Sequence, residues 1–384
     1  MAKNKGLGRM ESLGFAMRIG ITCYPGIGGS GLVATRLAME LAHRGHEVHL
    51  ITYEVPFLLQ EGSHPNITVD LVDVVEYPLF RYAPYTVALA SRMAQVAETH
   101  KLDLIHVHYA IPHSVSAYLA RQMTGVPYVV TLHGSDVHIL GADPAYQLAT
   151  RFTVEAADAV TCVSKHICER AEHTLGVRCA ITPITNFTYP DVFKPGPCLH
   201  DDLPGGKLLV HVSNFRPIKR VTDLVTAFAQ IASDLADVHL LLLGDGPMRP
   251  EVDRLIQDLD LAERVYCLGF KRDIQTYLRC ARAFVLCSEL EGAPLSLLEA
   301  MSTALPCVTT AVGGIPEIIQ DRVNGILVPF GDLDALADGL YAVLTDDGLA
   351  RRLGEHARTT ILAHHTPEKV VPQYEAVYEK VLHR

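Results

Sequence analysis

Two glutamates eight residues apart are the strongest local sign of chemistry in the sequence. Glu291 and Glu299 stand in the segment SELEGAPLSLLEAMSTALP, with a Gly-Ala-Pro turn between them. Because Pro294 suits the first turn of a helix, Glu291 is predicted in the loop at the helix entrance and Glu299 about one turn inside. Free backbone N–H groups near Leu295 and Ser296 could then hold a phosphate, while each carboxylate could bind a pair of hydroxyls.

Cations follow a predicted strand in the segment HVSNFRPIKR. Arg216, Lys219 and Arg220 come just after the apolar run that ends near Val212. Cations in a cleft otherwise lined by carboxylates suit a diphosphate, although solvated charges at a helix start are the plainer alternative. The turn Gly244-Asp245-Gly246 in LLLGDGP could support a base or a ribose on its backbone.

Histidines follow two further predicted strands, in HVHYAIPH and TLHGSD. His133 precedes a glycine, and a histidine on such a turn can exchange a hydrogen bond with a sugar hydroxyl or a leaving group. His106 and His108 share one face of a strand, a spacing that a metal could use. Since no carboxylate or cysteine completes a ligand set, we favour polar residues at a strand end that face the cleft.

A glycine loop opens the chain's first strand-to-helix unit. Gly26-x-Gly28-x-x-Gly31 follows an apolar run, and the next apolar run ends at Glu54. This pattern matches the dinucleotide-binding fingerprint, so an NAD-dependent oxidoreductase is one interpretation and a tight structural turn is another. The oxidoreductase interpretation explains residues 20–54 and none of the later cations and glutamates.

Two Asp-x-Asp pairs have the spacing of a metal-dependent transferase. Asp258 and Asp260 are predicted at a helix end, and Asp332 and Asp334 at a helix cap and its first turn. Aspartates favour these positions for structural reasons. We therefore expect neither pair to hold a catalytic metal.

Strand and helix patterns alternate along the chain, and these elements must position the side chains named above. Continuous Val, Ile and Leu runs indicate strands covered on both faces, hence parallel sheets with crossover helices. The predicted strands are Arg18–Cys23, Val48–Tyr53, Ile67–Val72, Leu104–His108, Tyr128–Leu132, Ala159–Val163, Leu208–Val212, Val238–Leu243, Val265–Leu268, Ala283–Cys287 and Pro306–Thr310.

The alternation is interrupted by a Pro- and Gly-rich stretch around residues 186–206. We expect an α/β protein with two Rossmann-like, doubly wound domains that face a central cleft. The predicted division is a loose extension at 1–16, an N-terminal Rossmann-like domain at 17–190, a linker at 191–206, a C-terminal Rossmann-like domain at 207–365, and a C-terminal helix at 366–384 that packs back toward the first domain.

Bulk composition narrows the class of protein. The 384 residues carry a formal charge of −10, which argues against nucleic acid as a partner. Nine scattered cysteines without a C-x-x-C pair predict reduced core thiols in a cytoplasmic protein. No apolar run approaches the roughly 18 residues of a membrane span.

Taken together, the motifs GGSG, HGSD, RPIK, GDGP and the E-x7-E element resemble the retaining glycosyltransferases of family four, which have the GT-B architecture. The resemblance runs from Met17 to the C-terminus. Within that family, GITCYPGIGGSG, HVHYAIPH, TLHGSDVHILG, VSNFRPIKRV and VGGIPEII are similar to members that transfer N-acetylglucosamine from UDP-N-acetylglucosamine to L-malate, the first step of bacillithiol biosynthesis.

The resemblance implies a role for each matching residue. Donor-binding residues would be Gly29, Arg216, Lys219, Gly244, Glu291, Leu295, Ser296 and Glu299, with Glu299 on the ribose hydroxyls. Acceptor-binding residues would be Ser30, Tyr109, Thr131, Asn186 and Arg216. Catalytic residues would be His133, Glu291, Arg216 and Lys219, acting by front-face displacement with retention, without a metal or other cofactor.

The loop between the two glutamates departs from the expected pattern. It reads EGAPLSLLE where close relatives lead us to expect ESFGLVLLE. Because this loop faces the donor sugar, it bears on sugar choice more than on UDP binding. Another sugar nucleotide or acceptor, a non-catalytic sugar-nucleotide-binding module, and a homodimer remain open from sequence alone.

Overall fold

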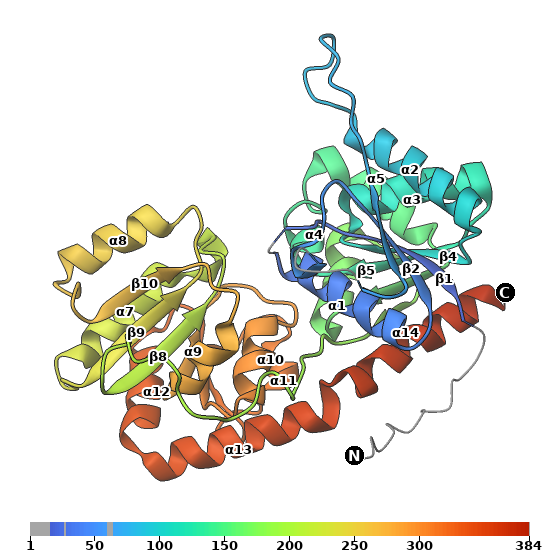
Figure 1. The fold of residues 1–384 in the computed structure, drawn as a ribbon. Coiled ribbons are helices and arrows are strands. Elements are labelled where there is room, and N and C mark those ends of the chain that lie inside the picture. The colour runs from blue at the N-terminus through green and yellow to red at the C-terminus, as the bar shows by residue number, and fades with distance from the viewer. Residues whose placement is uncertain (1–15, 27, 60–63, 384) are drawn as a thin grey trace, which may run out of the picture.

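The computed structural model describes residues 16–26, 28–59 and 64–383, and it forms two lobes joined side by side (Figure 1). Each lobe is a parallel β-sheet packed between helices, so the two doubly wound domains predicted from the sequence are confirmed. Residues 1–15 of the predicted N-terminal extension lie outside the described residues.

The first sheet has the strand order β3-β2-β1-β4-β5-β6-β7 within the described residues. Its strands are β1 Arg18–Thr22, β2 Glu47–Thr52, β3 Ile67–Leu71, β4 Leu104–His108, β5 Tyr128–Leu132, β6 Ala159–Cys162 and β7 Ile181–Pro183. Its helices include α1 Gly29–His43, α2 Tyr85–His100, α3 Ala110–Thr124, α4 Ser135–His138, α5 Pro144–Glu155 and α6 Lys165–Arg170. The order reverses between β1 and β4, where ligands bind in such sheets.

The second sheet has the order β10-β9-β8-β11-β12-β13 within the described residues. Its strands are β8 Lys207–Val212, β9 Val238–Leu243, β10 Val265–Gly269, β11 Ala283–Leu286, β12 Cys307–Thr310 and β13 Ile326–Val328. Its helices are α7 Val221–Ala232, α8 Arg249–Asp258, α9 Ile274–Cys280, α10 Leu295–Ser302, α11 Ile315–Ile318, α12 Leu333–Thr345 and α13 Asp347–His364. The reversal here lies between β8 and β11.

The last helix, α14 Pro367–Leu382, leaves the second lobe and lies along the first (Figure 1). Its apolar face, including Val370, Tyr374 and Tyr378, packs in one core cluster with Ile19 and Leu37. Apolar burial of this kind contributes about 25 cal/mol per Å². The chain therefore passes between the lobes twice. The first crossing is the segment between β7 and β8, and the second is the short segment between α13 and α14. Packing of α14 on the first lobe holds the second crossing in place.

The two crossings are bonded to each other. The backbone N–H of Thr188 donates to the carbonyl of His365 at 2.9 Å, and the His365 ring donates from Nδ1 to the carbonyl of Asn186 at 3.2 Å. The first crossing is also tied to α10, because the Ser302 hydroxyl donates to the Phe193 carbonyl at 2.6 Å. These bonds hold the two crossings to each other and to α10.

Cysteine chemistry departs from the sequence prediction. Cys162 and Cys168 form a disulfide, as do Cys198 and Cys280, so the prediction that all nine thiols are reduced is wrong for these four. Cys162 ends β6 and Cys168 lies in α6, one short turn later, with Cα atoms 5.8 Å apart. The second pair is 82 residues apart in sequence, a proximity that only the tertiary fold creates.

The Asp-x-Asp pairs have the structural roles that the sequence favours. The Asp332 carboxylate caps α12 by accepting from the Ala335 N–H at 2.9 Å, and Asp258 ends α8. None of these aspartates lines the cavity described below. No helix among the described residues is long and apolar enough to cross a membrane.

Candidate active site

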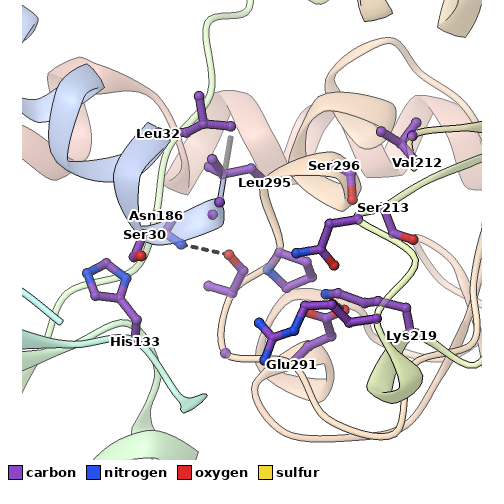
Figure 2. A pocket seen from close by; sticks show the side chains of 18 of the residues that line it. Ser30, Leu32, His133, Asn186, Val212, Ser213, Lys219, Glu291, Leu295 and Ser296 are labelled. Carbon is purple, nitrogen blue, oxygen red and sulfur yellow. Dashed lines mark hydrogen bonds and ion pairs between the residues drawn. The ribbon is translucent and has the colours of Figure 1, made fainter. Parts of the chain in front are cut away.

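A cavity of about 730 Å³ lies between the two lobes, at the carboxyl ends of both sheets. That volume lies within the usual range for small-ligand sites. Figure 2 shows Ser30, His133 and Asn186 on the side of the first lobe, with Lys219, Glu291 and Ser296 on the side of the second. Among the predicted site residues, those that line it are Gly29, Ser30, Tyr109, His133, Asn186, Arg216, Lys219, Gly244, Glu291, Leu295, Ser296 and Glu299.

Glu291 is held by a cation and a hydroxyl. Lys219 Nζ lies 2.6 Å from Glu291 Oε1, and the Ser288 hydroxyl donates to the same oxygen at 2.6 Å. Glu291 is buried, so the positive charge of Lys219 offsets the cost of removing the carboxylate from water. Lys219 thus stands where it can also meet an anionic ligand.

Glu299 is also buried, and its cation comes from the other lobe. Arg36 of α1 donates from Nη2 to Glu299 Oε1 at 2.6 Å. Burial raises the pKa of the Glu299 carboxyl, and the charge and hydrogen bond of Arg36 oppose that rise. This ion pair joins α1 to α10 directly across the cleft.

Helix α10 presents its N-terminus to the cavity. Pro294 precedes it in extended conformation, and Leu295 and Ser296 form its first turn and line the cavity. The first N–H groups of a helix have no partner within the helix and carry a partial positive charge. A phosphate in the cavity would find such donors next to the Lys219 ammonium.

Arg216 follows β8 and is exposed at the cavity. Within the described part of the chain, no ion pair or hydrogen bond engages its guanidinium. Its charge acts on Tyr109 across the cleft: burial raises the pKa of Tyr109 to about 12, and Arg216 opposes this rise. Arg216 is therefore available to an anion from either lobe.

His133 is a neutral imidazole at the cavity wall. Burial, with a smaller contribution from His113, lowers the pKa of His133 to about 3. One ring nitrogen, Nε2, lies 3.1 Å from Nδ1 of His108. Since a neutral imidazole has one N–H and one acceptor nitrogen, this contact fixes how His133 presents its other nitrogen to a ligand.

Thr131 is the predicted site residue that does not line the cavity. Its side chain is fully buried, and its hydroxyl is shared by His106 Nε2 and the Thr161 hydroxyl, each at 2.6 Å. Thr131 does not line the cavity, so the predicted contact with the acceptor is wrong. The residue is still paired within the sheet, opposite His108, whereas His133, just beyond the end of the same strand, lines the cavity.

The sequence interpretation had His106 and His108 facing the cleft, but both lie beneath the cavity and do not line it. Both are fully buried, and His106 Nδ1 pairs with the Tyr378 hydroxyl of α14 at 2.7 Å. Burial is the main cause that lowers the pKa of both rings. They are neutral groups that support His133, and they form no metal set in the described structure.

The glycine loop brings α1 close to β1 on the first-lobe side of the cavity. A Cβ at Gly31 would collide with the Tyr24 carbonyl, so only glycine permits this close approach. Gly29 and Ser30 then line the cavity at the start of α1. Glu54, which a dinucleotide ribose would require, is exposed and outside the cavity.

Two further residues of the first lobe have partners that fix them. The Tyr109 hydroxyl lies 2.9 Å from the Ser135 hydroxyl. Asn186 donates from Nδ2 to the Ala293 carbonyl of the second lobe at 2.7 Å, while its buried Oδ1 has no partner in the described structure. Asn186 therefore holds the lobes together and keeps one acceptor free.

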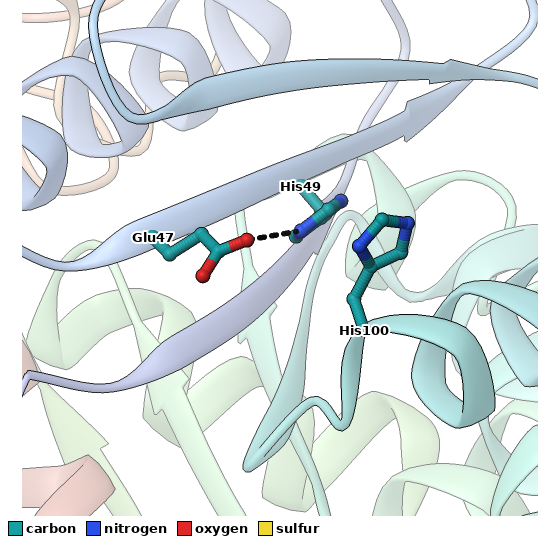
Figure 3. Close-up of side chains that lie close together, drawn as sticks. All are labelled: Glu47, His49 and His100. Carbon is teal, nitrogen blue, oxygen red and sulfur yellow. Dashed lines mark hydrogen bonds and ion pairs between the residues drawn. The ribbon is translucent and has the colours of Figure 1, made fainter.

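Among the described residues, one group of side chains has donor atoms close enough for a metal ion: Glu47, His49 and His100 (Figure 3). His49 already pairs through Nδ1 with Asp70 at 2.8 Å and through Nε2 with Glu47 at 3.2 Å. Burial would lower the pKa of His49, but these carboxylates raise it. None of the group lines the cavity, and we interpret it as an ion-paired histidine that ties β2 to β3.

Comparison with known proteins identifies the family of this chain. The model of Glycosyltransferase Family 4 matches residues 27–191, and that of Glycosyl transferases group 1 matches residues 202–360. The chain belongs to glycosyltransferase family 4, and it is a glycosyltransferase. Among its relatives, the N-acetyl-alpha-D-glucosaminyl L-malate synthase of Bacillus anthracis is 43% identical over 373 residues, which cover 95% of this chain and 97% of that protein.

Solved structures share the two-lobed GT-B fold. A sucrose-phosphate synthase from Thermosynechococcus elongatus superposes with a TM-score of 0.84 at 22% identity, over 96% of this chain and 99% of that one. Anabaena Alr3699/HepE in complex with UDP and glucose gives a TM-score of 0.80 at 22% identity, over 94% and 99%. Family membership also makes the oxidoreductase interpretation of the glycine loop wrong.

The sequence reasoning missed Arg36, which reaches the cavity from the middle of α1. One signal was present: an arginine embedded among buried residues such as Val33, Leu37 and Leu41 has no solvated face to occupy. Its partner Glu299 is 263 residues away in sequence, so the pattern along α1 could not identify the contact. Phe270 and Arg272, after β10, also line the cavity and were not predicted.

Proposed function

We propose that this enzyme transfers N-acetylglucosamine from UDP-N-acetylglucosamine to the hydroxyl of L-malate, which is the first step of bacillithiol biosynthesis. The observation that carries the proposal is the 43% identity with the Bacillus anthracis L-malate synthase over nearly the whole of both chains. The cavity supports it, since it brings the guanidinium of Arg216 and the ammonium of Lys219 into one space with two buried carboxylates between the lobes. Cations suit the diphosphate, and carboxylates suit sugar hydroxyls.

The donor would lie against the second lobe. Glu299 would accept hydrogen bonds from the ribose diol, and Glu291 from hydroxyls of the transferred sugar. Lys219, Arg216 and the N-terminus of α10 would surround the diphosphate, with Gly244 near the nucleoside. Each of these groups lines the same cavity.

The acceptor would lie against the first lobe. L-Malate carries two carboxylates and one hydroxyl, so it needs donors on more than one side. Ser30, Tyr109 and Asn186 offer polar groups there, and the free guanidinium of Arg216 could meet a carboxylate. His133, neutral at physiological pH, would contact the reacting sugar rather than carry a charge to it.

We propose front-face displacement with retention of the anomeric configuration. The bond from the sugar C1 to the UDP oxygen breaks with its electron pair on the phosphate, and the malate oxygen bonds to C1 on the same face. The malate proton passes to the departing phosphate oxygen. Charge that develops on UDP would be stabilised by Lys219, Arg216 and α10, in the manner of preorganised electrostatic sites.

We also propose that the reaction needs no metal, because the ammonium, the guanidinium and the helix N-terminus supply positive charge where a diphosphate would lie. Turnover should then be unchanged after treatment with a chelator. Loss of activity in EDTA that returns with a divalent cation would contradict this part.

The decisive experiment measures UDP release across a panel of sugar nucleotides, each with and without L-malate. Release that requires both UDP-N-acetylglucosamine and L-malate supports the proposal, and the anomeric configuration of the product by NMR tests retention. If the enzyme prefers another sugar nucleotide, we would attribute its different sugar specificity to the EGAPLSLLE loop. UDP-sugar binding without UDP release for any acceptor would instead identify a binding module.

Assembly and location are further parts of the proposal. We propose a homodimer, because the segment 73–84 exposes a series of large apolar side chains, namely Val75, Tyr77, Leu79, Phe80 and Tyr82. Light scattering of the purified chain tests this, and a monomer at all concentrations would refute it.

We propose a cytoplasmic location, where UDP-sugars and malate are made. Disulfides rarely persist in that compartment, so the pairs Cys162–Cys168 and Cys198–Cys280 provide the test. In the disulfide-bonded form that the structure describes, these four thiols are protected from alkylation, whereas denaturing alkylation at the moment of lysis should label all nine cysteines if a cytoplasmic environment keeps both pairs reduced. Protection of these four alone would point to an oxidising compartment.

A further inference from the structure

Arg36 stands at the meeting point of both lobes and the first crossing between them. Its guanidinium carbon lies 5.6 Å from the Tyr189 ring centre and 5.9 Å from that of Phe193, while Nη2 contacts Glu299 of α10. Arg36 is 7% exposed and Glu299 is 4% exposed, so water screens their interaction little. The pair is too deeply placed to be a surface salt bridge.

Only part of each partner is used in the contact. Glu299 Oε1 takes the hydrogen bond, and within the described structure no group bonds to Glu299 Oε2. Arg36 Nη1 is buried and has no partner among the described residues. Buried polar atoms in native proteins nearly always find partners, so the unpaired Nη1 of Arg36 and the unused oxygen of Glu299, on two residues that line one cavity, indicate a ligand that can both accept and donate.

A vicinal diol has that chemistry, because each hydroxyl can donate and accept. A ribose has one at its 2′ and 3′ positions. A carboxylate binds a diol well only while it is ionised, and burial works against ionisation at Glu299. Arg36 opposes that effect from 2.6 Å away.

We propose that Arg36 is a positioning residue of the donor site: it keeps Glu299 ionised and holds Oε1, so that Oε2 faces the ribose diol. This inference rests on the proposed function, since it takes a uridine nucleotide as the ligand. It adds that nucleotide affinity depends on a residue of the acceptor-side lobe. The donor site is thus complete only while α1 and α10 are in contact.

The test compares UDP with 2′,3′-dideoxy-UDP, which lacks the diol, by calorimetry on the full-length protein. The ratio of their dissociation constants reports what the diol contributes. For the wild type we expect a ratio of about 10- to 100-fold, the usual effect of a hydrogen bond to a charged group. In Arg36→Met the ratio should fall to near one, through weaker UDP binding with dideoxy-UDP unchanged.

A pH series separates positioning from packing. Without the guanidinium, burial of Glu299 is uncompensated and its pKa rises further, so UDP affinity of Arg36→Met should increase as the pH rises from 6 to 9. Arg36→Lys retains a positive charge and should restore a flat profile. In combination with Glu299→Gln, Arg36→Met should cause no further loss, because both changes act on one interaction.

Arg358 provides the matched control. It is a partly buried arginine that donates from Nη1 to the carbonyls of Phe193 and Ser302, at the same crossing and the same helix, yet it does not line the cavity. Arg358→Met should leave the ratio unchanged. Arg36→Gln removes the charge but keeps an N–H donor, and it carries the same test if Arg36→Met does not fold.

The outcomes are distinct. An unchanged ratio and a flat pH profile in a folded Arg36 variant would overturn the role of Arg36 while leaving UDP as the donor nucleotide. Absence of UDP binding by the wild type would overturn the proposed function and this inference with it. A lowered ratio in the Arg358 control, equal to that of Arg36→Met, would show that general packing at the crossing is responsible, and would also overturn the role.

Discussion

Replacement of Lys219 by methionine is the sharpest test of how the enzyme would stabilise a departing UDP. Methionine keeps most of the apolar stem and removes the ammonium, whose Nζ lies 2.6 Å from Glu291 Oε1. Two unit charges about 4 Å apart interact by roughly 4 kcal/mol at an effective dielectric constant of 20. That sets the upper limit for what Lys219 can contribute to a phosphate oxygen at similar range.

Loss of one preorganised group of this kind costs on the order of 10²- to 10³-fold in kcat, or about 2.7–4 kcal/mol. We expect Lys219→Met to fall in this range. The loss should appear in kcat, because charge accumulates on the phosphate as the sugar departs, while UDP affinity should weaken less. The assay is steady-state UDP release at saturating UDP-N-acetylglucosamine and L-malate, with calorimetry for UDP.

The same substitution also leaves Glu291 buried with the Ser288 hydroxyl as its remaining partner. A buried carboxylate without its cation destabilises a fold by about 3 kcal/mol; because the Lys219 side chain keeps 20% exposure, this is an upper figure. Lys219→Met/Glu291→Gln should therefore recover most of the lost melting temperature and remain slow. A well-folded Lys219→Met enzyme within tenfold of wild-type kcat would refute this account.

Three other perturbations address the remaining parts of the molecule. Glu299→Gln should weaken UDP binding by about tenfold or more, and wild-type affinity in calorimetry would exclude a ribose contact. His133→Ala should abolish turnover and leave UDP affinity nearly intact; a fully active variant would remove His133 from the mechanism. The ion pair of His49 and Asp70 should make stability pH-dependent, because carboxylates raise the pKa of His49 against burial and cations lower that of Asp70 against burial. The His49 contribution is present below its unfolded pKa and is lost as pH rises through the raised value, while the Asp70 contribution is lost as pH falls through the lowered value; equal slopes of melting temperature against pH for wild type and His49→Gln would contradict this.

The central strands of both sheets could be predicted closely because they are continuous apolar runs that are buried on both faces. The run Val238–Leu243 was predicted with its exact limits, for example. The strands Ile181–Pro183 and Ile326–Val328 were missed, since three residues at a sheet edge carry no periodic signal. Short edge strands are defined by their neighbours rather than by their own composition.

The site could be predicted at the ends of strands and at the starts of helices, where residues such as His133 and Ser296 line the cavity. His133 lies one residue beyond β5 and reaches the cavity, whereas Thr131 lies inside the same strand and is covered by the next layer of side chains. A one-residue error in a strand end therefore changes which residue faces a ligand. Arg36 depends on packing between lobes, which no local pattern encodes.

Glu291 and Glu299 are both buried carboxylates that are stabilised by a cation, and the two cations come from different lobes. Each is buried, and each has Oε1 bonded to a cation: Lys219 for Glu291 and Arg36 for Glu299. Lys219 belongs to the same lobe as Glu291, so the proposed contact of Glu291 with the sugar hydroxyls would persist whether the lobes are together or apart. Arg36 belongs to the opposite lobe, so separation of the lobes would leave Glu299 without compensation and favour its protonation. If Glu299 binds the ribose as proposed, nucleotide release and lobe opening would be coupled, because opening would break the contact that keeps the Glu299 carboxylate charged.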